Sequence, residues 1–210
     1  MPSRLFISLA VIVACAAACS DQSGEETRAQ LLEMGRTDQE VRERIMGLLN
    51  DSGPAALSTD EFRSLFEEQQ LVDERNFLGL EAIVTEHGWP DERLIGEEAT
   101  GAAWIVMQHA SIERQKRFLP LLRQAVAENR ALASNLAMLE DEIALADQGK
   151  QIYGTEITMT DGKAMIAPVA DPETIDERRA SVGLPPIEEY LRRAEAELGA
   201  QIDRSALDAD

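Results

Sequence analysis

The sequence predicts a mainly helical protein, with a single helical domain, one β-hairpin at about residues 151–169 and two C-terminal helices. Apolar residues recur at helical spacing along most of the chain. A change of texture near residue 150 introduces two strand-like segments around an Asp-Gly turn. Aromatic residues make up only 4% of the 210 residues, so the core must be mostly aliphatic, which suits helices packed through small residues.

The first helix of the folded domain is expected around residues 38–49. Val41, Ile45, Leu48 and Leu49 fall on one helix face, and Thr37 or Asp38 is expected to cap the helix. The following segment, residues 50–56, contains Ser-Gly-Pro and is predicted to be a loop.

A long helix is predicted from residue 58 to residue 87. Ser58 and Glu61 have the spacing of a capping box, and Gly88 with Pro90 should end the helix. Its inward-facing residues are expected to be Phe62, Leu65, Phe66, Leu80, Ile83 and Val84.

Three further helical segments fill the middle of the chain. Residues 97–109 are apolar nearly all round and should form a central helix. Ser111 can cap the next helix, in which Pro120 should cause a kink or a restart. The helical period then continues to Gly149. The expected core residues of the last two segments are Phe118, Leu122, Val126, Leu132, Leu136, Leu139 and Ile143.

The hairpin strands are expected at residues 152–159 and 163–169, on either side of Asp161-Gly162. Asp171-Pro172 should then open a helix that ends at Gly183. Pro185-Pro186 precedes a last helix, whose apolar face is Tyr190, Leu191, Ala194 and Leu198. Residues 200–210 are predicted to be a disordered acidic tail.

The N-terminus has the organisation of a lipoprotein signal peptide, predicted over residues 1–18. Arg4 precedes an apolar run that is too short to span a membrane, and Ala16-Ala17-Ala18-Cys19-Ser20 resembles the lipobox of bacterial lipoproteins. Cys19 is the first choice for lipidation and Cys15 the second, while secretion after Ala18 without a lipid is the remaining alternative. Residues 19–30 would be an acidic tether, and 31–199 the folded domain.

This organisation implies a lipid-anchored protein of the bacterial cell envelope that faces the periplasm. The outer membrane is expected ahead of the inner membrane as the place of the anchor. The chain has only the two cysteines already named, so the mature protein would contain neither a disulfide nor a free thiol beyond Cys19. Its formal net charge of −19 argues against nucleic acid as a partner. No cofactor and no metal are expected.

Only two histidines occur in the chain, and both are candidate functional residues because histidine titrates nearest neutral pH. His87 lies in His87-Gly88-Trp89-Pro90, which could equally be an ordinary helix C-terminus. His109 follows Gln108 and could equally be a hydrogen-bonded core residue. Asp73 and His87 share a helix face but lie about 21 Å apart along it, so they cannot form a direct acid–base pair.

Other polar residues have two interpretations each. Gln151 and Tyr153 are two residues apart on an expected strand, so their side chains would share one side of it, in a groove or in a packed hairpin. Arg178 and Arg179 indicate either a solvated face or a buried arginine that joins the hairpin to the helices, near Asp171 or Asp176.

The order of these motifs resembles a bacterial family of unknown function marked by HGWP, QH and QxYG motifs. The resemblance rests on His87-Gly88-Trp89-Pro90, Gln108-His109 and Gln151-x-Tyr153-Gly154-Thr155, with Asp171 to Leu184 after them. Asp38-Gln39-x-x-Arg42 and Asp73-x-x-Asn76 belong to the same pattern. Where the family often has Asp-Arg before the hairpin, this chain has Asp141-Glu142. The resemblance implies no activity.

Two functions are compatible with this sequence. The first is a lipid-anchored binding or interaction module, which would hold a small polar ligand or an envelope protein in a polar pocket near the HGWP turn. The second is an envelope hydrolase with a histidine general base, for which His87, His109 and Tyr153 are the candidate catalytic residues. The expected ligand-binding residues are Asp73, Asn76, His87, Trp89, Gln108, His109, Gln151 and Tyr153.

Overall fold

The computed structural model describes residues 10–160 and 162–208, with side chains from residue 23 onward. It is 74% helical, with a small three-stranded sheet and two C-terminal helices, so the predicted fold class is confirmed. The chain divides into two compact units. Unit 1 contains the residues up to Glu86 together with Pro90–Val106, and unit 2 contains His87–Trp89 and the residues from Met107 onward. That both units form a single domain stays a prediction.

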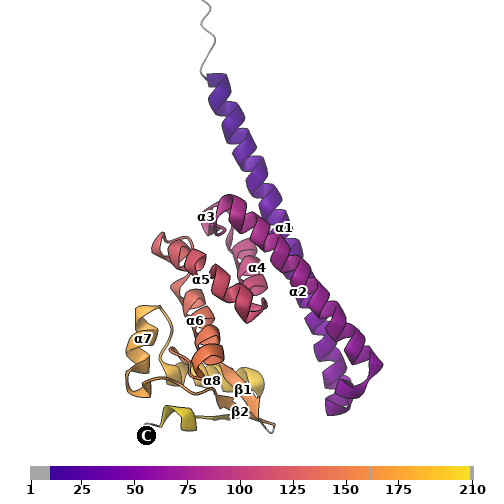
Figure 1. Cartoon of the computed structure of the whole chain (residues 1–210), viewed down its shortest axis with the longest axis vertical. Helices are drawn as coiled ribbons and strands as arrows, with labels where there is room; N and C mark the ends of the chain where they lie inside the picture. Colours follow the sequence, from indigo (N-terminus) through magenta and orange to yellow (C-terminus); the bar gives the residue numbers. More distant parts are fainter. Residues whose placement is uncertain (1–9, 161, 209–210) are drawn as a thin grey trace, which may run out of the picture. The chain divides into compact units, whose positions relative to one another are not determined.

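Unit 1 is built on two long helices that lie side by side (Figure 1). These are α1 (Ala10–Ser52) and α2 (Asp60–His87), joined by the short 3₁₀ helix η1 (Gly53–Ser58). The helix expected to begin at Thr37 or Asp38 instead begins far upstream, and the segment expected as a tether, residues 19–30, lies within α1. Thr37 caps nothing, because its hydroxyl donates to the carbonyl of Glu33 one turn earlier.

The start of α2 is fixed by Thr59 rather than by Ser58. The Thr59 hydroxyl accepts a hydrogen bond of 3.1 Å from the backbone N–H of Phe62, whereas Ser58 donates to the carbonyl of Ala55. The predicted core residues Leu65, Leu80, Ile83 and Val84 are buried. Phe66 was expected to face inward, but it is 46% exposed and stacks on the ring of Phe62.

Unit 1 is completed by α3 (Glu92–Ile95) and most of α4 (Glu97–Gln108). The predicted central helix is confirmed, since Ala99, Ala102, Ala103, Val106 and Met107 are all buried. Helix α4 approaches α1 closely at Gly35, where an added Cβ atom would lie 2.8 Å from the Cβ of Ala102. Only glycine allows this contact between the two helices.

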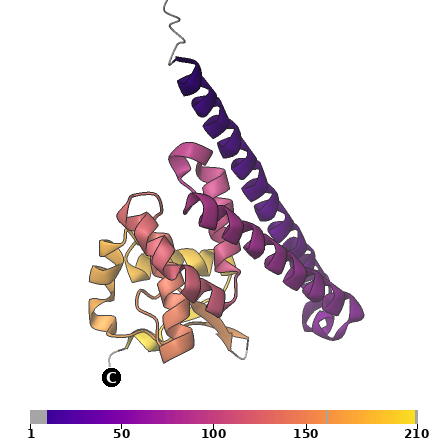
Figure 2. The same ribbon diagram turned by 45° about the horizontal axis from the view of Figure 1, so that its top comes forward.

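Unit 2 begins with the helix pair α5 (Ile112–Ala127) and α6 (Ala133–Gln148), which lie side by side (Figure 2). Helix α5 continues through Pro120 rather than restarting there. Pro120 is exposed, so water can bond to the carbonyl that its missing N–H leaves without a partner. Gly149 ends α6 in the left-handed conformation, as predicted.

The sheet of unit 2 confirms the predicted hairpin and adds a strand to it. Strands β1 (Ile157–Thr160) and β2 (Lys163–Ile166) pair antiparallel around the turn, of which Asp161 lies outside the described residues. Strand β3 (Ile202–Asp203) pairs parallel with β2. The prediction that residues 200–210 are disordered is therefore wrong for this strand. The side chain of Ile202 is 3% exposed, and its burial in the core holds the tail in place.

The C-terminal elements are η2 (Pro172–Thr174), α7 (Ile175–Ser181), α8 (Ile187–Leu198) and η3 (Ser205–Leu207). Asp171 makes no side-chain cap, and Thr174 is the residue before α7. Leu191 of α8 is fully buried as predicted, but Leu198 is 53% exposed. The core of this region consists of Ala164, Ile166, Val169, Ile175, Ile187, Leu191 and Ile202.

The residues on which the lipoprotein prediction rests lie largely outside the part of the chain that the structure describes with side chains. Residues 1–9 are not described, and Cys15 and Cys19 lie in α1 but without described side chains. Over residues 10–160 and 162–208, no helix has a stretch both long and apolar enough to cross a membrane.

Candidate functional site

The segment Gln151–Glu156 in unit 2 is a hydrogen-bonded loop rather than the expected strand. Gln151 forms only an isolated bridge with Val169. Its side chain is fully buried: the amide nitrogen donates to the carbonyls of Glu156 and Ala167, at 3.1 and 2.8 Å, and the amide oxygen accepts from the N–H of Glu156. Gln151 therefore closes the loop and has no exposed surface for a ligand.

Asp141 of α6 holds the same loop from the other side. One of its carboxylate oxygens accepts from the N–H groups of Ile152 and Tyr153, at 2.6 and 2.7 Å, and the other from the N–H and hydroxyl of Thr155, at 2.9 and 2.8 Å. Asp141 is 0% exposed. Four donors thus replace the water that a buried carboxylate loses.

Two arginines bind the carbonyl groups of this loop. Arg178 donates to the carbonyl of Ile152 at 2.8 Å, and Arg179 donates to that of Tyr153 at 2.7 Å. Arg179 is fully buried, its guanidinium lies 4.9 Å from the ring centre of Tyr190, and burial lowers its pKa. A solvated face is therefore wrong for Arg179, which joins the loop to α8 through carbonyl groups and a ring rather than through a carboxylate.

Beside this loop lie two carboxyl groups with raised pKa values. The pKa of Glu156 is raised to about 7, first by burial and then by the negative charges of Glu142 and Asp141. Burial also raises the pKa of Glu142, against the opposing effects of a hydrogen bond with Gln115 and the charge of His109. This places His109 and two partly buried carboxyl groups in one electrostatic cluster.

Gln115 contacts that cluster, whereas Tyr153 contacts Glu140. Gln115 of α5 is fully buried, and its amide nitrogen donates to the carbonyls of Gln108 and Ala110, at 3.0 and 3.2 Å. The Tyr153 hydroxyl lies 3.4 Å from a carboxylate oxygen of Glu140, and burial raises its pKa. Of the predicted residues, His109 belongs to this cluster, the carbonyl of Gln108 accepts from Gln115, and Tyr153 lies beside Glu140 instead. The sequence did not single out Gln115 or Glu156, and Glu142 was noted only as a departure from the family pattern.

The HGWP segment is a helix C-terminus, one of its two expected roles. His87 is exposed and is the last residue of α2. Gly88 has φ +75°, and an added Cβ atom would lie 3.3 Å from a guanidinium nitrogen of Arg130. That guanidinium donates to the carbonyl of Trp89, whose side chain is 3% exposed. That His87 and His109 share a pocket stays a prediction.

Asp73 and Asn76 belong to unit 1, where they help join α2 to α1. Asn76 is 2% exposed and donates to the carbonyl of Met34 at 2.9 Å. Asp73 accepts from the guanidinium of Arg42 at 2.8 Å, and the same guanidinium lies 3.2 Å from Asp38, which is 1% exposed. The DQxxR and DxxN motifs thus supply a network of polar contacts between the two helices.

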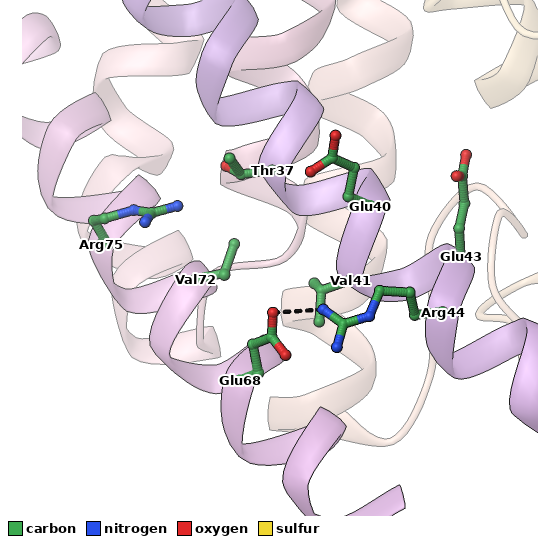
Figure 3. Close-up of a pocket in the computed structure, with 8 residues that line it drawn as sticks. All are labelled: Thr37, Glu40, Val41, Glu43, Arg44, Glu68, Val72 and Arg75. Carbon is green, nitrogen blue, oxygen red and sulfur yellow. Dashed lines mark hydrogen bonds and ion pairs between the residues drawn. The ribbon is translucent and has the colours of Figure 1, made fainter. Parts of the chain in front are cut away.

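Next to this network, α1 and α2 form a groove with a volume of about 530 Å³ (Figure 3). Helix α1 contributes Thr37, Glu40, Val41, Glu43 and Arg44 to it, and α2 contributes Glu68, Val72 and Arg75. Arg44 and Glu68 form an ion pair of 2.6 Å across the groove. This groove could not be identified from the sequence, because its lining alternates charged and apolar residues as any solvated helix face does.

Comparison with known proteins identifies the family. A family of unknown function, DUF6624, matches residues 25–203, so the chain belongs to it. No curated protein and no solved structure matches the chain. Among the described residues, no group of three or more His, Cys, Asp or Glu side chains is placed to hold a metal ion.

Proposed function

We propose that this protein is a lipid-anchored binding module of the bacterial cell envelope, and that unit 2 carries its binding site for a small polar ligand or an envelope protein. The binding groups would be His109, Glu142 and Glu156. The lipid would be attached at Cys19 and would hold the protein at the periplasmic face of a membrane, with the outer membrane as the first choice. The proposal for the anchor rests on residues 1–20 alone.

The observation that carries the binding site is the pair of raised pKa values at Glu142 and Glu156. Two partly buried carboxyl groups that repel each other destabilise the folded state. Groups with such perturbed pKa values are concentrated at functional sites. A ligand with an ammonium or guanidinium group would relieve the repulsion and would lower both pKa values. A basic side chain of a partner protein has the same chemistry.

The diamine putrescine is a suitable probe for this site. We expect it to bind the full chain and to lower the pKa of Glu156, as followed by NMR of the glutamate carboxyl carbons. Glu156→Gln should abolish the binding, whereas Glu173→Gln, at an exposed position of unit 2, should leave it unchanged. An ordinary pKa for Glu156 in the free protein, or binding that survives in Glu156→Gln, would contradict the proposal.

The lipid anchor can be tested in the bacterium itself. A clickable fatty acid should label the wild-type protein, and Cys19→Ala should lose the label. Cys15→Ala should keep it. Label that persists in Cys19→Ala and is lost in Cys15→Ala would move the anchor, and label absent from the wild type would exclude it.

A hydrolase with His109 as general base is a second candidate, because Glu142 interacts electrostatically with His109. A carboxyl group beside a histidine can orient its ring for proton transfer. Turnover of p-nitrophenyl acetate by the full chain would support this function if His109→Gln abolished it and His87→Gln did not. Equal turnover by wild type and His109→Gln would argue against it.

A further inference from the structure

We propose that the groove between α1 and α2 is a second binding site, and that it takes a zwitterionic peptide about three residues long. The groove belongs wholly to unit 1, so it is separate from the carboxyl groups of unit 2. Its volume of about 530 Å³ lies within the range of small-molecule sites, roughly 300–1,000 Å³.

The charges of the groove include one cation and one anion that the fold does not use. Glu68 is paired with Arg44, and Glu40 is paired with Arg36. In the described part of the chain, the side chains of Arg75 and Glu43 take part in no hydrogen bond or ion pair, and Arg75 acts on Glu33 only through its charge. Both side chains are exposed at the groove, and a ligand can bind them without breaking an existing ion pair.

These two charges lie at opposite ends of the groove (Figure 3). Contacts across the helix pair fix their separation: Thr37 meets Asn76, next to Arg75, and Arg44, next to Glu43, meets Glu68. Six residues of α1 or seven of α2 thus separate the two ends. At 1.5 Å per residue this is about 9–10 Å along the helix axes.

An extended tripeptide spans about 10 Å, because each residue adds roughly 3.3–3.6 Å. Its carboxylate would accept hydrogen bonds from the Arg75 guanidinium, and its ammonium group would pair with Glu43. Between them, the partly buried Val72 offers apolar surface to the body of the peptide. Since both charged contacts are open to solvent, we expect weak binding, with a Kd of about 0.1–1 mM.

The test uses the full chain in detergent micelles and the tripeptide Ala-Ala-Ala, by NMR titration and calorimetry. Binding should shift the amide signals of residues that line the groove. Amidation of the peptide C-terminus or acetylation of its N-terminus should each weaken binding about tenfold, because each removes one charged contact.

Variants assign each end of the peptide. Arg75→Gln should weaken binding of the free tripeptide and make it equal to that of the amidated one. Glu43→Gln should likewise weaken binding of the free tripeptide and make it equal to that of the acetylated tripeptide. Arg63→Gln and Glu67→Gln, at exposed positions of α2 outside the lining, are the matched controls and should bind as the wild type does.

Absence of saturable binding at millimolar tripeptide would overturn this proposal, and so would binding that is unchanged in Arg75→Gln. Glu156→Gln should not alter tripeptide binding. Failure of either site can therefore be told from failure of the other.

Discussion

Each unit buries a carboxylate, and the two carboxylates have different partners. In unit 1, Asp38 is held by the guanidinium of Arg42, which also pairs with Asp73. In unit 2, Asp141 is held by three backbone N–H groups and one hydroxyl. The first arrangement joins two helices that are regular already, whereas the second determines the path of a loop that has no regular structure.

This difference predicts how each network responds to substitution. An ion pair with a partner about one-fifth exposed to solvent is partly screened, so its loss is moderate and depends on salt. A buried carboxylate that satisfies several backbone N–H groups cannot be replaced by water when it is removed. We therefore expect the loop of unit 2 to be the more sensitive region.

The largest effect is expected for Asp141→Ala. It leaves three backbone N–H groups without their acceptor, and we expect a loss of about 3–5 kcal/mol in the free energy of unfolding. Urea denaturation at two salt concentrations measures it, and the loss should not depend on salt. Asp147→Ala on the same helix, whose side chain is 47% exposed, is the control and should cost less than about 0.5 kcal/mol. If Asp141→Ala does not fold, Asp141→Asn gives the milder measurement.

Arg42→Met should have the next largest effect, about 2 kcal/mol, because it leaves the buried Asp38 without its cation. High salt should reduce the difference from wild type. The control is Arg44→Met, which breaks an exposed pair and should cost about 0.5 kcal/mol or less. A salt-independent loss in Arg42→Met would remove the contrast between the two units.

Glu156 should make unit 2 sensitive to pH. Its pKa of about 7 lies above the ordinary 4.5, so the folded chain holds this proton more tightly than the unfolded chain. The stabilisation is complete below about pH 4.5 and is lost as the pH rises to about 7. Allowing for solvent screening, we expect a fall of about 1–2 kcal/mol over that range. The fall should be absent in Glu156→Gln, and an equal fall in both proteins would refute the assignment.

The smallest effect is expected for Thr155→Val. This change removes one hydroxyl donor from Asp141 and keeps the three backbone N–H groups, so we expect a loss of about 1 kcal/mol. Comparison with Asp141→Ala by urea denaturation separates the side-chain contribution from the backbone contribution. A loss as large as that of Asp141→Ala would mean that the hydroxyl, rather than the backbone, holds the carboxylate.

Patterns within one element could be predicted from the sequence. The apolar spacing of α2 and its stop at Gly88 are local properties of helices, and both are correct. The Asp-Gly turn placed the hairpin, because few residues adopt the required backbone angles. Asp38 and Arg42 pair at the four-residue spacing of one helix, although Asp38 was expected only as a possible helix cap.

Errors arose where the surroundings of a residue, rather than its type, decide its role. Thr37 has the chemistry of a helix cap, but its surroundings are helical on both sides, and its hydroxyl turned to the preceding carbonyl instead. Ile202 lies in a tail of polar composition, and only the exposed edge of β2 and the core beneath it make this residue a strand. Phe66 was assigned to the core from its type, yet it is 46% exposed and stacks on Phe62 of the same helix.

The sequence by itself determined the helical class, the hairpin, the ends of most helices and the expectation of a lipid anchor. Only the tertiary structure decided that Asp141, Gln151 and Arg179 form the frame of a loop, and that Glu142 lies near both His109 and Glu156. Backbone N–H and carbonyl groups are the same at nearly every residue. The residue types in the sequence therefore do not reveal which backbone groups a buried side chain will bind. Burial, which raises the two glutamate pKa values, exists only once the chain has folded.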